Sequence, residues 1–85
     1  MTLKAAKSLF DEIVDLCYQL GDHTLDVALE SFYQEVNQAQ SEYDILEITS
    51  ELMFYVDEIT SYNHDLDETK IEIQELYNKM QDELE

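Results

Sequence analysis

The chain lacks proline entirely and has a single glycine among its 85 residues. These two residue types form the turns and bulges of β-sheets, so their scarcity argues against a β-rich fold and favours helices. The hydrophobic fraction, 45%, is well above that of a disordered acidic tail, so the chain is expected to fold. A chain of this length buries one modest core. We therefore expect residues 1–85 to form a single acidic all-α domain.

Cysteine is equally scarce, because Cys17 is the only one. An intramolecular disulfide, and with it a disulfide-stapled secreted scaffold, is therefore excluded. Acidic residues interrupt the apolar segment that a signal peptide would need near the N-terminus. No apolar run approaches the roughly 18–20 residues that cross a bilayer. These features together lead us to expect a cytoplasmic protein.

Basic residues are the third scarcity: four Lys or Arg stand against 21 Asp or Glu, which gives a formal net charge of −17. All four basic residues lie outside the segment from Ser8 to Thr69. Direct binding to nucleic-acid phosphates or to anionic membranes depends on Lys and Arg, so we expect neither. So much like charge in one small body also repels itself. This cost suggests that the acidic surface serves a purpose.

Hydrophobic residues recur every three or four positions in the first half of the chain, which predicts two amphipathic helices. The first is expected over residues 3–20, with Thr2 as its N-cap and Gly21 in the left-handed conformation that ends many helices. The second is expected over residues 24–40. Two residues are suitable N-caps for this second helix: Asp22 and Thr24.

A third helix is expected over residues 43–61, because the apolar stripe changes phase after the second helix. The phase slip falls within QAQSEYD, where Ser41 followed three residues later by Asp44 forms a weak capping box. A change of phase in the hydrophobic pattern indicates a break between helices.

Beyond residue 61 the sequence leaves two architectures open. Asp65 followed by Glu68 is typical of a helix N-terminus and predicts a fourth helix over residues 66–84, which would complete a bundle of four similar helices. A heptad series nevertheless continues through this point without interruption. Its members are Ile45, Leu52, Ile59, Leu66, Ile73 and Met80. The alternative is therefore two short helices and one long C-terminal helix that requires a second chain, giving a homodimer.

A calcium loop is the sharpest site hypothesis, because Asn63, Asp65 and Asp67 occupy the first, third and fifth positions of such a loop. The pattern then fails. Glu68 stands where the loop needs a turning glycine, and Gln74 stands where it needs a bidentate glutamate. A helix boundary is the better interpretation of this stretch.

Other metal or catalytic sites are not indicated. His23 and His64 are expected at the same end of a four-helix bundle, where they could share a metal, although solvated loop residues are the simpler interpretation. Cys17 lies on the apolar face of the first helix and is expected to be a buried side chain rather than a nucleophile. The chain has no Gly-rich phosphate loop. We expect no enzyme, no cofactor and no metal.

Tyrosine is comparatively abundant, with six residues. Three are expected to pack on or beside the core: Tyr55, Tyr62 and Tyr77. Three lie off the apolar stripes or at their margin: Tyr18, Tyr33 and Tyr43. Exposed tyrosine beside carboxylates is typical of protein recognition. The predicted partner-binding residues are Asp26, Glu30, Tyr33, Glu35, Glu42, Tyr43, Asp44 and Glu47.

Two functions of different classes remain. In the first, the protein is a non-enzymatic module that covers a basic surface of a protein partner, as an inhibitor, an antidote or a DNA mimic does. In the second, it is a small acidic helical chaperone or coiled-coil adaptor that acts through apolar helix faces, with a homodimer as one form. A complex matched by charge should weaken steeply with salt, whereas apolar packing should not.

Overall fold

The computed structural model describes residues 1–84 and contains four α-helices within them. A short 3-10 helix, η1, precedes the last of them. The prediction of an all-α bundle of four similar helices is thereby confirmed. The elements are α1 (Leu3–Tyr18), α2 (His23–Gln38), α3 (Glu42–Thr60), η1 (His64–Leu66) and α4 (Asp67–Leu84).

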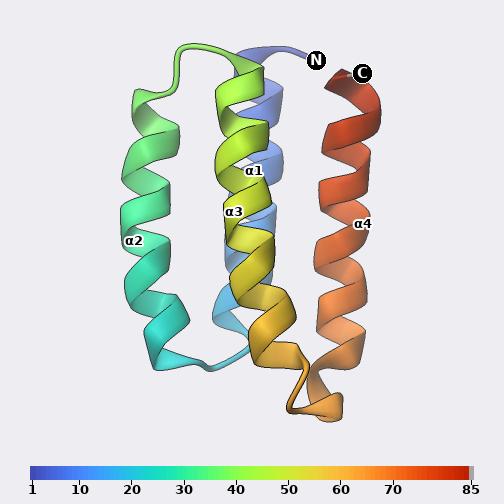
Figure 1. The fold of residues 1–85 in the computed structure, drawn as a ribbon. Coiled ribbons are helices and arrows are strands. Elements are labelled where there is room, and N and C mark those ends of the chain that lie inside the picture. The colour runs from blue at the N-terminus through green and yellow to red at the C-terminus, as the bar shows by residue number, and fades with distance from the viewer. Residues whose placement is uncertain (85) are drawn as a thin grey trace.

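Successive helices run antiparallel, so the two ends of the described chain lie at the same end of the bundle (Figure 1). α1 and α3 pack against each other through the middle of the molecule, and α2 and α4 lie on opposite sides of this pair (Figure 1). The molecule measures 34 × 24 × 16 Å along its principal axes. One long side of α3 therefore faces away from the rest of the bundle.

The core is one cluster of hydrophobic side chains to which all four helices contribute. Its largest fully buried hydrophobic members are Phe10, Ile13, Leu25, Leu29, Ile45, Leu52, Ile73 and Met80. Cys17 is fully buried among them, as predicted. Two threonines of α3 are also buried, and the hydroxyls of Thr49 and Thr60 donate to the carbonyls of Ile45 and Val56 at 2.7 Å. These bonds remove the cost of burying a hydroxyl group.

The first three helices begin at the caps that the sequence predicts. The side-chain oxygens of Thr2, Asp22 and Ser41 accept hydrogen bonds from the backbone N–H groups three residues later, at 3.1, 2.9 and 3.2 Å. Asp22, not Thr24, is thus the N-cap of α2. Gly21 has a φ of +69°, the left-handed conformation expected of it.

The alternative prediction of one long C-terminal helix is wrong, because α3 ends at Thr60 and the chain turns before α4 begins. Asn63 causes part of this break: its side-chain oxygen accepts from the backbone N–H of Asp65 at 3.0 Å and caps η1. Asp65 is therefore not the N-cap that the sequence suggested. Leu66 still packs against the core, which explains why the heptad series survives the break.

Candidate functional site

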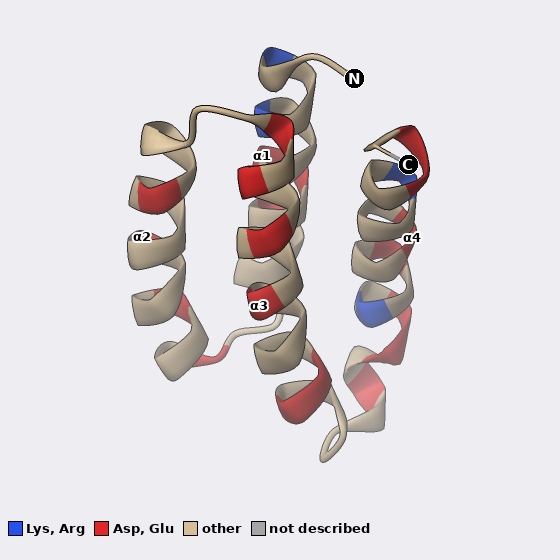
Figure 2. Ribbon diagram, turned by 45° about the horizontal axis from the view of Figure 1, so that its top comes forward, with Lys and Arg blue, Asp and Glu red and all other residues tan. Residues whose placement is uncertain are grey.

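Charge is segregated along the bundle, because α2 and α3 carry no Lys or Arg (Figure 2). Basic residues lie only on the first turns of α1 and on α4 (Figure 2). Of these two helices without Lys or Arg, α3 is the more acidic. Its carboxylates are Glu42, Asp44, Glu47, Glu51, Asp57 and Glu58. Within residues 1–84, a cation lies within 4 Å of only one of the six: Lys70 Nζ is 3.7 Å from Asp57 Oδ1. The remaining five are free to attract a cation from elsewhere.

Aromatic side chains lie exposed on the same side of α3. Phe54 is 72% exposed and Tyr43 is 63% exposed, while Tyr62, just beyond the helix, is 87% exposed. The cause is helical geometry: Leu52 and Val56 face the core, so Phe54, between them in sequence, faces the opposite side of the helix. Leaving a phenylalanine in water forgoes about 1.5–3 kcal/mol of burial free energy. Such exposure is typical of a surface that a partner covers.

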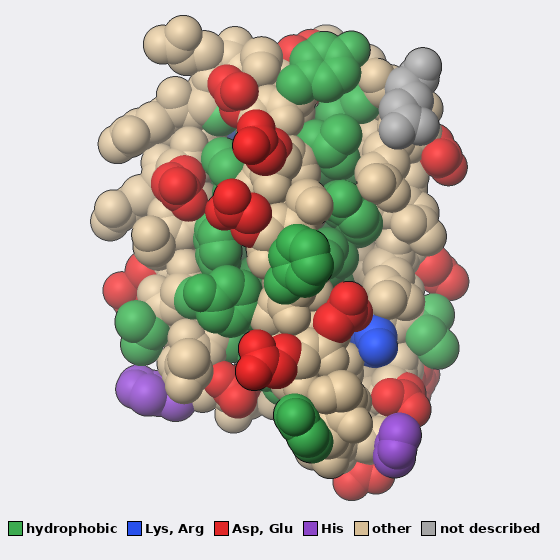
Figure 3. All heavy atoms as spheres, viewed as in Figure 1, with side chains coloured by type: hydrophobic (Ala, Val, Ile, Leu, Met, Phe, Trp, Pro, Cys, Tyr) green, Lys and Arg blue, Asp and Glu red, His purple; other side chains and the backbone are tan. Residues whose placement is uncertain are grey.

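Carboxylates and aromatic rings are interspersed along this surface, which we name the α3 face. Its members are Tyr43, Glu47, Glu51, Phe54, Tyr55, Glu58 and Tyr62. Each of the three rings on α3 has a carboxylate three or four positions away in sequence, the spacing that places two side chains side by side on a helix. Tyr62 follows the helix and lines a hollow together with Glu58. Figure 3 views the molecule from this side and shows acidic and hydrophobic side chains interleaved over α3, with a basic side chain only toward α4.

Two hollows border the α3 face on the side of α2. One, of about 400 Å³, lies near the start of α2 and is lined by Asp22, Thr24, Tyr55, Glu58, Ile59 and Tyr62. The other, of about 300 Å³, lies near the end of α2 and is lined by Glu35, Gln38, Ala39, Asp44, Glu47 and Ile48. The lining of each combines carboxylates with an apolar side chain. Each can therefore take a side chain that has an apolar stem and a cationic head.

Two contacts fix aromatic members of the face. The ring of Tyr55 packs edge-on against Phe32 of α2, with ring centroids 5.7 Å apart and planes at 78°. The hydroxyl of Tyr43 donates to the backbone carbonyl of Leu84 at 3.3 Å. Fixed rings lose little conformational freedom when a partner binds.

The structure places seven of the eight predicted partner-binding residues on two surfaces. Tyr43, Asp44, Glu47 and Glu35 lie together on the α3 side of the molecule. Glu42 is partly buried in the first turn of α3.

The other three predicted residues, Asp26, Glu30 and Tyr33, follow one side of α2. Tyr33 lines a separate hollow between α1 and α2, together with Asp11, Val14, Asp15 and Tyr18. Burial, and then repulsion from Asp15, raises the pKa of Asp11 in this hollow. One carboxylate oxygen of Asp26 is buried and has no hydrogen-bond partner in residues 1–84.

Sequence reasoning missed five members of the α3 face: Glu51, Phe54, Tyr55, Glu58 and Tyr62. It expected Tyr62 to pack at the core, which is wrong because the chain leaves the helix after Thr60 and carries that ring into solvent. Tyr77 does pack against the core, and Tyr18, Tyr33 and Tyr43 are exposed, as predicted. The signal for Phe54 was present, because it lies half a turn from the buried series.

The remaining site hypotheses gain no support. Histidine side chains occur at two separate places on the end of the molecule opposite the chain termini (Figure 3). His64 Nδ1 lies 3.4 Å from Asp67 Oδ2, in the stretch that the calcium loop would occupy. Nowhere in the described part of the chain do three or more His, Cys, Asp or Glu side chains form a group that could hold a metal.

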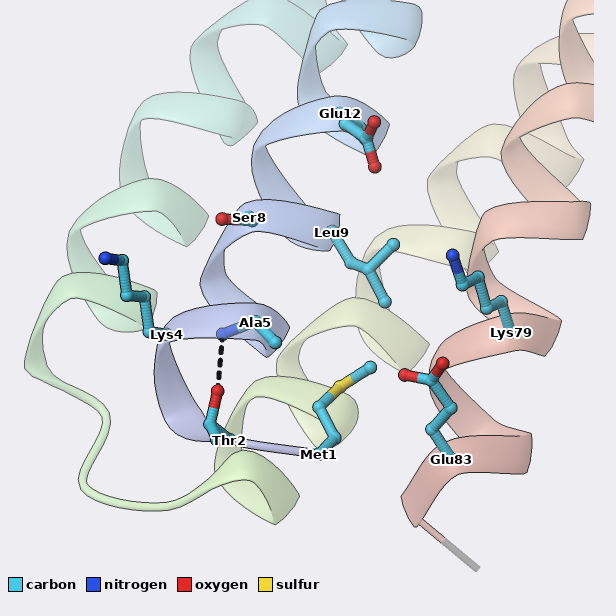
Figure 4. A pocket seen from close by; sticks show the side chains of 9 residues that line it. All are labelled: Met1, Thr2, Lys4, Ala5, Ser8, Leu9, Glu12, Lys79 and Glu83. Carbon is cyan, nitrogen blue, oxygen red and sulfur yellow. Dashed lines mark hydrogen bonds between the residues drawn. The ribbon is translucent and has the colours of Figure 1, made fainter.

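Another hollow, of about 490 Å³, lies between α1 and α4 near the chain termini (Figure 4). It is lined by Met1, Thr2, Lys4, Ala5, Ser8, Leu9, Glu12, Lys79 and Glu83. The charges of Lys4 and Lys79 are balanced by those of Glu12 and Glu83, and Lys4 points away from α4 (Figure 4). The hollow therefore shows no preference for a ligand of either charge.

Comparison with protein-family models, curated proteins and solved structures finds no match for this chain. None of the helices in residues 1–84 combines the length and the apolar character needed to span a membrane. Function is therefore inferred from the geometry and the charge of the molecular surface.

Proposed function

We propose that the protein is a non-enzymatic binding module that covers a basic surface of a protein partner with its α3 face. The observation that supports this most strongly is the combination of unpaired carboxylates and exposed rings on a helix without a single basic residue. A cytoplasmic location is part of the proposal, whereas direct binding to nucleic acid or membrane is not.

Each component of the α3 face has a role in such a complex. Carboxylates that lack an internal partner attract a basic surface over a distance and orient it during encounter. Exposed aromatic rings supply contact area at the centre of an interface, where most of the binding free energy arises. Charge thus brings the partner to the face, and the rings hold it there.

The proposal includes the inhibitor, antidote and DNA-mimic types. Glu47 and Glu58 are eleven positions apart, about 16 Å along a helix that rises 1.5 Å per residue. Negative groups on a rigid helix over this length can occupy a groove that otherwise binds phosphates. The partner would then lose its access to nucleic acid while the module stays bound.

The alternative, a chaperone or coiled-coil adaptor, needs an apolar helix face that is free to receive a partner's helix. In the bundle, the apolar stripes of the four helices face one another around one core. Away from the α3 face, the exposed hydrophobic residues form no continuous apolar helix face: Val27 lies on α2, Ile71 lies on α4, and Tyr18 and Tyr33 share a hollow with two carboxylates. The first function is therefore the better supported of the two.

Affinity capture from a lysate of the source organism tests the proposed function. The tagged protein is the bait, and washes at about 50 mM and about 500 mM NaCl run in parallel, since the screening length falls to a few Å at the higher salt. We expect one or more basic proteins to be retained at low salt and lost at high salt.

Two bait variants of equal charge locate the binding surface. The first carries Glu47→Gln, Glu51→Gln and Glu58→Gln on the α3 face. The second carries Glu72→Gln, Glu75→Gln and Asp82→Asn, all exposed positions of α4. We expect the first variant to lose the basic protein and the second to retain it. Equal retention by both variants, or a partner that survives the high-salt wash, would contradict the proposal.

A further inference from the structure

We infer that the α3 face binds an arginine-rich segment of its partner and selects arginine over lysine. This inference rests on the proposed function and adds the chemistry of the side chains that the face recognises. Charge alone does not distinguish the two cations. The aromatic rings beside the carboxylates do.

Phe54 lies between two unpaired carboxylates of the α3 face. Glu51 precedes it by three positions and Glu58 follows it by four. Residues at these spacings have Cβ atoms about 5–6 Å apart on a helix surface. A flat cation placed on the exposed ring of Phe54 can therefore reach a carboxylate on either side without leaving the ring.

A guanidinium group can interact with the ring and with a neighbouring carboxylate at once, whereas an ammonium group cannot do both equally well. A guanidinium is planar, stacks on aromatic rings, and directs two parallel N–H groups at one carboxylate. It is also more weakly hydrated than an ammonium group, so less water must be removed when it lies on a ring. A lysine can neutralise Glu51 or Glu58, but its compact and strongly hydrated head gains less from the ring.

The hollow near the start of α2 repeats this arrangement at a second point. It combines the rings of Tyr55 and Tyr62 with the carboxylate of Glu58 and the apolar side chain of Ile59. The ring of Tyr55 is already held by its contact with Phe32. An arginine that enters here places its aliphatic stem against Ile59 and its guanidinium between ring and carboxylate.

Charge complementarity favours an arginine-rich segment over other occupants of the α3 face. A second copy of this chain would bring another net charge of −17 against the face, so it is repelled. An apolar helix would bury Glu47, Glu51 and Glu58 without a counter-charge, which is costly. A segment with several arginines both neutralises the carboxylates and covers the rings.

The test uses two synthetic peptides with one alanine-rich sequence, in which the same positions carry arginine in one peptide and lysine in the other. Their affinities for the intact protein are measured by fluorescence anisotropy at about 20 mM NaCl, where screening is weak. With two ring contacts, each worth a factor of about two to five, we expect the arginine peptide to bind about tenfold more tightly.

Phe54→Ala should reduce this preference by about two- to fivefold, because it weakens the binding of the arginine peptide more than that of the lysine peptide. Ile71→Ala, at an exposed hydrophobic position of α4, is the matched control and should leave both affinities unchanged. Circular dichroism verifies that both variants fold.

The possible failures are distinguishable. Equal binding of the two peptides would overturn the selection of arginine while agreeing with a face that binds basic surfaces. An equal loss of both affinities in Phe54→Ala would also overturn it. If neither peptide bound, the proposed function itself would be contradicted, and this inference with it.

Discussion

Burial determines the chemistry of Cys17, the single thiol. It lies in the core between the helices, and burial raises its pKa from 9.0 to about 12. The thiol is therefore neutral at physiological pH, and a neutral thiol is a poor nucleophile. The same burial that gives Cys17 its packing role also keeps its sulfur away from solvent.

Native protein should consequently react with a thiol reagent such as Ellman's reagent at pH 8 at least about 100-fold more slowly than the urea-unfolded chain. Stability should also depend on pH above 9. Because the folded pKa is raised, the contribution of this group to stability is complete below about pH 9 and is lost as the pH rises toward 12. Similar reaction rates for native and unfolded protein would show that the thiol is accessible.

Asp11 provides a second prediction at the scale of one residue. Burial, followed by repulsion from Asp15, raises its pKa, so the folded state disfavours its charge. Asp11→Asn removes that charge and should raise the melting temperature at pH 7 by about 1–2 °C. The gain should disappear below the ordinary pKa of 3.8, where Asp11 is protonated in both states.

Thermal unfolding at pH 7 and pH 3 measures this effect. Asp82→Asn, at an exposed position of α4, changes the net charge equally and is the control. If both variants shifted the melting temperature by the same amount, the effect would come from net charge and not from the surroundings of Asp11.

At the scale of the helices, a single hydrogen bond fixes the start of α2. Asp22 Oδ1 accepts from the backbone N–H of Leu25 at 2.9 Å, although Thr24 is an equally good cap by residue type. Asp22→Ala should lower the free energy of unfolding by about 1 kcal/mol, whereas Thr24→Ala should change it by a few tenths. Urea denaturation measures both. A larger effect for Thr24→Ala would place the cap two residues later.

Helix positions were predictable wherever periodicity and capping residues agree. Thr2 and Ser41 cap their helices as the sequence indicates, and Gly21 is left-handed as expected, although α1 ends at Tyr18, two residues before its predicted end. The stretch after residue 60 was ambiguous because its heptad series and its capping residues point to different structures. Local hydrogen bonding decided the outcome: Asn63 caps η1, and α4 starts at Asp67.

Only two of the seven members of the α3 face were predicted, for a different physical reason. Tyr43 and Glu47 follow from their place off the apolar stripe. Tyr33 and Glu35 were both predicted to bind the partner, yet the two lie on opposite sides of α2, in hollows shared with α1 and with α3. Which helices become neighbours depends on tertiary packing, and hydrophobic periodicity within one helix carries no information about it.

At the scale of the whole molecule, self-repulsion should make stability depend on salt. The Cα radius of gyration is 12.1 Å, so at low ionic strength carboxylates on different helices lie within the screening length of one another. An increase in NaCl from about 20 mM to about 500 mM should raise the melting temperature by several degrees.

Differential scanning calorimetry measures this change. The variant with Glu47→Gln, Glu51→Gln and Glu58→Gln carries less charge on α3 and should show a smaller salt effect than the unmodified protein. A melting temperature that does not change with salt would mean that the carboxylates interact too weakly to oppose folding.

We propose that the partner binds the α3 face, and amide NMR spectroscopy tests this claim most directly. The arginine peptide is titrated into the isotope-labelled protein at low salt, and the shift of every backbone amide is followed. We predict that the largest changes fall between Tyr43 and Tyr62, with the centre at Phe54, while the outer side of α4 around Ile71 stays unchanged. Changes of equal size over all four helices, or changes concentrated on α4, would contradict the claim.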